Sequence, residues 1–99
     1  MNAPNALLVG SDRDHLVAEL ADESGPDWAA AYRPGTSGCH ELLDRVAMLM
    51  DMADRYVVEH PACLARPEWY SLADRAAEAL RQLYQQVGAE HLGAEDVEE

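Results

Sequence analysis

A chain of 99 residues allows one small domain, which buries only about 60–65% of the surface of its unfolded chain. The net charge of −12, from nineteen acidic residues against seven arginines and no lysine, argues against nucleic acid or an anionic membrane as a direct ligand and favours a protein partner with a basic surface. No segment approaches the ~20 apolar residues of a membrane span, and no secretory signal peptide is visible, so we expect a cytoplasmic protein.

The first third of the chain predicts one helix. Residues 1–10 show no helical period and are expected to be an extended or frayed lead. Ser11 is a suitable cap for a helix with acidic residues in its first turn, so a helix is predicted over 11–24, and Gly25-Pro26 ends it. A short helical turn is then predicted over 26–32.

The longest periodic segment, residues 38–60, follows a linker of turn residues over 33–38. It predicts a helix of roughly 34 Å, which Thr36 or Ser37 can cap. Apolar residues recur three and four positions apart, as in a helix that buries one face. The predicted buried stripe consists of Cys39, Leu42, Val46, Leu49, Ala53, Tyr56 and His60, widened by Leu43, Met50 and Val57.

A second long helix is predicted over 67–87, with Pro67 in its first turn and Gly88 as its left-handed end. Pro61 stops the preceding helix, so only about six residues connect the two. Such a short connection requires the helices to return antiparallel, as a helical hairpin.

The expected fold class is therefore all-α. The hairpin of 38–60 and 67–87, with the shorter helix 11–24 packed on it, gives a small helical bundle and a single domain over 1–88. Residues 89–99 are polar and acidic, and we expect a disordered tail there.

No constellation of residues indicates catalysis. Cys39 and Cys63 would lie on the order of 30 Å apart along one helix, which predicts free thiols. His40 and His60 add one possible ligand to each end, but two ligands fall short of the four of a structural zinc site. The chain has no nucleophile elbow and no glycine-rich phosphate loop. We expect no catalytic residue, no cofactor and no metal.

The remaining features are those of a binding surface. A second apolar patch off the main stripe is covered either by the N-terminal helix or by another molecule. Tyrosines on one edge of the second long helix are efficient interface anchors, and aspartates on the outer face of the first can meet a basic groove. The predicted partner-binding residues are the methionines Met48 and Met52, the tyrosines Tyr70 and Tyr84, and the aspartates Asp44, Asp51 and Asp54.

In these class properties the chain resembles phage or prophage inhibitors, anti-CRISPR proteins included: it is small, acidic, helical and without a catalytic motif. The resemblance implies a non-enzymatic binding protein whose acidic helical surface occupies a basic site and so inhibits or regulates a nucleic-acid-handling complex. The alternative is a structural or adaptor protein in which two hairpins pair through Met48, Met52 and their neighbours as a homodimer.

Overall fold

Helices account for nearly all of the described chain. The computed structural model describes the backbone of residues 2–97 and the side chains of residues 12–94. Within that part it contains helices and turns but no strand, so the predicted all-α class is confirmed. The chain divides into two units, Met1–Tyr32 and Arg33–Glu99, where the sequence predicted one domain over 1–88. Among the described residues, no helix has the length and apolarity needed to cross a membrane.

The first unit begins with helix α1, Asn2–Ser24. The extended lead predicted over 1–10 is therefore wrong for residues 2–10, and so is the cap at Ser11, while Met1 lies outside the described part. Alanine and leucine, strong helix formers, are frequent between residues 3 and 8. Pro4 falls in the first turn, where it is tolerated, and Gly10 costs a helix interior only about 1 kcal/mol.

The end of α1 follows the prediction. Gly25 adopts a left-handed φ of +96° and donates its N–H to the carbonyl of Ala21 at 2.9 Å, as a C-terminal glycine does. The 3-10 helix η1, Trp28–Tyr32, then occupies the predicted short turn.

The second unit opens on a capped helix. Helix α2, Ser37–Met52, begins after Thr36, whose hydroxyl oxygen accepts the N–H of Cys39 at 3.3 Å. This satisfies one of the free N–H groups of the first turn. The helix continues as a π-helix, η2, Ala53–Val58, and the wider turn shifts its residues out of the α-helical phase. Val58 is therefore half-buried, while Val57 is exposed.

A short helical corner follows η2. Helix α3, Pro61–Leu64, fills most of the predicted connection, and His60 is its N-cap. The N–H of Ala62 donates to Nδ1 of His60 at 3.0 Å. The sequence placed this histidine on the buried stripe of the long helix, whereas it is exposed and starts the next one.

Helix α4, Pro67–Val97, is longer than the predicted 67–87. Gly88 does not end it, and the disordered tail predicted over 89–99 is wrong as far as Val97, while residues 98–99 lie outside the described part. A Cβ at Gly88 would lie 3.7 Å from Cδ1 of Leu43, an ordinary van der Waals distance, so Leu43 of α2 adjoins this turn of α4.

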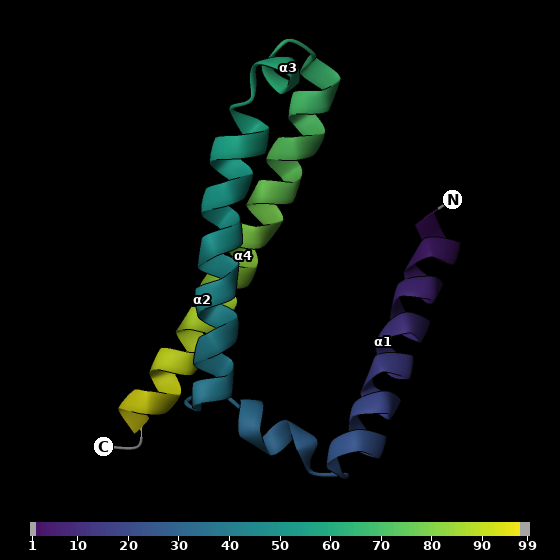
Figure 1. Cartoon of the computed structure of the whole chain (residues 1–99), viewed down its shortest axis with the longest axis vertical. Coiled ribbons are helices and arrows are strands. Elements are labelled where there is room, and N and C mark those ends of the chain that lie inside the picture. The colour runs from purple at the N-terminus through teal and green to yellow at the C-terminus, as the bar shows by residue number, and fades with distance from the viewer. Residues whose placement is uncertain (1, 98–99) are drawn as a thin grey trace. The chain divides into compact units, whose positions relative to one another are not determined.

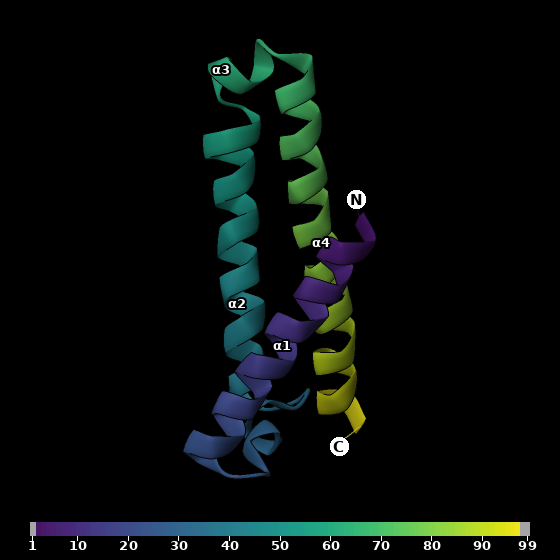
Figure 2. The same cartoon turned by 90° about the vertical axis from the view of Figure 1, so that its right-hand side faces the viewer.

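Helices α2 and α4 lie side by side in both views (Figures 1 and 2). They run in opposite directions, because Leu43 adjoins Gly88 whereas Asp54, later in the chain, meets Arg81, earlier in α4. The buried side chains between them are few. Among the described residues they are Cys39, Leu43, Val46, Ala77 and His91.

The predicted stripe is only partly buried. Cys39 and Val46 are buried, but Leu42, Leu49 and Tyr56 are exposed. The face of α2 that packs against α4 is instead centred on Leu43, so it is rotated about the helix axis relative to the predicted stripe. The exposed remainder forms a surface of its own.

Candidate interaction surface

The unit Arg33–Glu99 leaves most of its large apolar side chains in water. Four hydrophobic residues are buried among those described, whereas thirteen large hydrophobic side chains of this unit are exposed. Single exposed hydrophobic residues are ordinary, but a contiguous apolar patch marks an interaction site. Whether these side chains are contiguous therefore decides what the surface can do.

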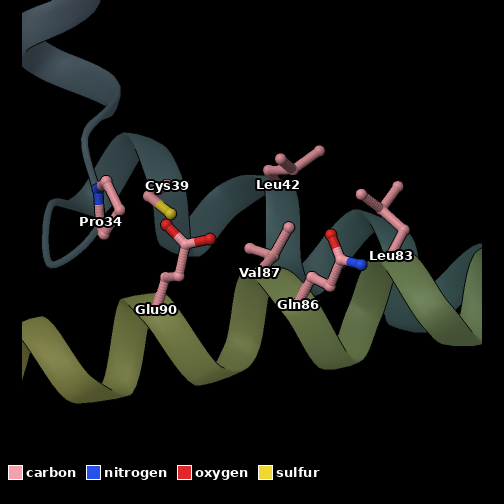
Figure 3. A pocket seen from close by; sticks show the side chains of 7 residues that line it. All are labelled: Pro34, Cys39, Leu42, Leu83, Gln86, Val87 and Glu90. Carbon is pink, nitrogen blue, oxygen red and sulfur yellow. The ribbon is translucent and has the colours of Figure 1, made fainter.

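Seven of them line three hollows between α2–η2 and α4. The first hollow, of about 150 Å³, is formed by α2, α4 and the loop at Pro34 (Figure 3). The middle and last hollows, of about 290 and 340 Å³, share Tyr56 and Val57. The seven exposed side chains are Leu42, Leu49, Met52, Tyr56, Val57, Trp69 and Leu83.

The three hollows form one row, which we name the apolar groove. Their residues advance along α2–η2 from Cys39 to Val57 while they descend along α4 from Glu90 to Trp69. This is the order expected between two antiparallel helices. The groove thus follows nearly the whole length of the helix pair.

The groove carries little charge. Among its lining residues, only Glu90 is an acidic residue, and none is an arginine. Figure 3 shows the Glu90 side chain rising from α4 toward Cys39 of α2. A partner of this surface therefore needs an apolar face rather than a charged one.

The aspartates of α2 lie on the opposite flank. Successive residues of a helix advance by about 100°, which places Leu42 and Leu49 on one side of the buried residues and Asp44 and Asp51 on the other. Asp44 lies 3.5 Å from His40, and Asp51 pairs with Arg55 at 3.1 Å. Both side chains are well exposed.

One arginine ties this flank to α4. Arg81 lies 2.9 Å from Glu78, 3.4 Å from Asp54 and 4.0 Å from Asp74. Its hydrogen bond to Glu78, together with the charges of the three carboxylates, raises the pKa of Arg81 against a lesser effect of burial. Three carboxylates around one guanidinium leave this flank negative. We name Asp44, Asp51, Asp54, Asp74 and Glu78 the acidic face.

The predicted apolar contacts separate in the structure. Met52 lines the groove, but Met48 does not line any of its three hollows. Tyr70 and Tyr84 are each seven residues from buried Ala77, so they lie on the side of α4 that faces α2 and η2. They are partly exposed there and do not form an outer edge.

A buried histidine was missed by the sequence prediction. His91 lies four residues beyond the predicted end of the second helix, and 1% of its surface is exposed. Its Nδ1 accepts the N–H of Gly35 at 2.9 Å, and its ring centroid lies 5.5 Å from that of His40. It fastens the loop before α2 onto α4. Nothing in a polar segment after a glycine signals such a role.

Neither cysteine is in a disulfide. Within the described part of the chain, no three or more His, Cys, Asp or Glu side chains gather where they could hold a metal ion. The candidate surface therefore consists of the apolar groove and the acidic face. No protein-family model, curated protein or solved structure matches this chain.

Proposed function

We propose that the chain is a non-enzymatic acidic binding protein, of the phage or prophage inhibitor type, which inhibits or regulates a nucleic-acid-handling protein complex. The observation that carries the proposal is the acidic face. Its two aspartates on α2 are well exposed, with their partners His40 and Arg55 on the same α2–η2 rod, on a chain with a net charge of −12. A nucleic-acid channel is basic, so these carboxylates occupy the place of phosphates.

The acidic residues divide by role. Asp44 and Asp51 point into water and are available to a basic partner, whereas Asp54 is engaged with Arg81 across the two helices. Asp44 and Asp51 therefore steer and hold the partner, and Asp54 positions α4 beside η2. Steering of this kind acts mainly on the association rate and weakens as salt screens it.

Two finer features belong to the same proposal. The antiparallel hairpin of α2–η2 and α4 is the working unit, and the protein acts in the cytoplasm.

The test is inhibition of target-DNA cleavage by a panel of purified CRISPR effector complexes, at low and high salt. The chain should inhibit at least one of them, more strongly at low salt. The double change Asp44→Asn and Asp51→Asn should raise the inhibitory concentration about tenfold, as for the loss of charge steering. The matched control removes the same two charges from α1, by Asp22→Asn and Glu23→Gln, and should inhibit like the original chain.

Two outcomes would overturn the proposal. One is the absence of inhibition throughout the panel at low salt. The other is inhibition that neither salt nor the Asp44 and Asp51 changes affect.

A second candidate function is favoured by a different observation. The apolar groove would suit a structural or adaptor protein that pairs through its hairpin, because such a surface is stable in water only when covered. The two functions use opposite flanks of the same helix pair and are compatible.

A further inference from the structure

The groove needs a cover that is present whenever the chain is folded. The buried side chains between α2 and α4 are few and small: Cys39, Leu43, Val46 and Ala77 are the apolar ones described. A unit of this size with so small a core gains little stability from its own burial. Covering the groove would add the apolar burial that the helix pair lacks.

The charge of the groove permits a second copy of the same chain. Two molecules of net charge −12 repel each other in general. The lining residues bear a formal charge only at Glu90, at one end. The acidic face lies on the other flank of the pair, so contact through the groove leaves the acidic faces of both copies in water.

The accessible area is also of the size that a dimer interface buries. Complete covering of the seven exposed side chains of the groove, each about half accessible, would bury roughly 800 Å², about what each partner contributes to a standard interface. A two-fold axis then places α2 of one copy antiparallel to either α2 or α4 of the other. Because both copies use the same surface, the assembly stops at a dimer.

The described side chains of the chain's own first helix, residues 12–24, fit the groove less well. Their large exposed hydrophobic residues are Leu16 and Leu20, and charged residues surround them. If a different protein covered the groove, the apolar side chains of the groove would be exposed to water until that protein bound.

We propose that a second copy of this chain covers the apolar groove, giving an antiparallel four-helix arrangement with an acidic face on each outer side. The pairing rests on the second candidate function and names its partner as another copy of the chain; it is independent of what the acidic face binds.

The test is the mass of the full chain in solution, measured by light scattering after size exclusion and by sedimentation over a wide concentration range. The original chain should be a dimer, and its mass should not change between low and high salt because the contact is apolar. Leu49→Glu places a carboxylate at the middle of the groove and should raise the dimer dissociation constant by roughly a hundredfold or more.

Met48→Glu is the matched control. Met48 is the neighbouring residue and is 56% exposed against 49% for Leu49, but it lies outside the groove, so this variant should remain a dimer. Circular dichroism of both variants separates loss of pairing from loss of helix.

A monomeric original chain at high concentration would overturn the proposal and assign the groove to α1 or to another protein. A dimer that Leu49→Glu leaves intact, with its helices retained, would also overturn it, because the contact would then lie elsewhere. Neither result bears on inhibition of a nuclease, which depends on salt and on Asp44 and Asp51.

Discussion

His91 connects two distant parts of the chain through a single ring. It lies almost fully buried on α4 and accepts the N–H of Gly35 across 56 positions of sequence. A backbone N–H that loses such a partner away from water costs about 1–3 kcal/mol. The ring also fills space that a smaller residue would leave empty.

We therefore expect His91→Ala to lower the free energy of unfolding by about 2–4 kcal/mol, measured by urea denaturation. His91→Asn should recover part of this loss, because its side-chain oxygen can take the place of Nδ1. His15→Ala is the control, since His15 is an exposed histidine of α1, and should change stability by less than about half a kcal/mol. Equal effects of the two alanine changes would mean that the Gly35 contact contributes nothing.

The buried residues of α2 show how far a periodic pattern can be interpreted. Both Cys39 with Val46 and Leu42 with Leu49 recur at helical spacing, so the sequence predicts an apolar helix but not which flank meets α4. In the structure Val46 is 3% exposed and Leu49 is 49% exposed. A surface groove that binds a partner and a buried core both consist of apolar residues at helical spacing. The periodicity of one sequence therefore cannot distinguish them.

At the scale of the element, the ends set by local chemistry were predictable and those set by packing were not. Thr36 caps α2 and Gly25 ends α1 through contacts within a few residues. Gly88 lies inside α4, and its neighbour there is Leu43, forty-five positions earlier in the chain, which no local signal reveals. The same limit applies to the π-helical turns of η2, for which the sequence holds no recognised local signal.

Gly88→Ala distinguishes the two roles of this glycine. In the helix interior, alanine is favoured over glycine by about 0.5–1 kcal/mol. The added Cβ would meet Leu43 at 3.7 Å, an ordinary van der Waals contact. We expect the thermal midpoint to rise by a few degrees, measured by circular dichroism. Gly25→Ala is the counterpart, with a φ of +96°, and should lower it. A lower thermal midpoint for Gly88→Ala would contradict this expectation and would indicate that the helix ends at Gly88 in a left-handed conformation.

At the scale of the whole molecule, the charge and the apolar surface separate onto opposite flanks of the α2–α4 pair. The sequence placed Asp44 and Asp51 in water, and the structure agrees. It placed Asp54 there too, but Arg81 of α4 contacts it, a pairing that no spacing within one helix reveals. Changing Asp54 together with Asp44 and Asp51 would therefore disturb the helix pair as well as the binding of a partner.

Concentration should control stability if two copies share the groove. A dimer that unfolds to two chains gains stability with protein concentration by mass action. A hundredfold rise in concentration should then raise the thermal midpoint by roughly 5 °C, measured by calorimetry. Leu49→Ala removes a side chain that is half exposed in the single chain, so its cost should be about 1 kcal/mol or less in dilute protein and larger in concentrated protein. A midpoint independent of concentration, with a Leu49→Ala cost of 2–5 kcal/mol throughout, would instead place Leu49 in the chain's own core.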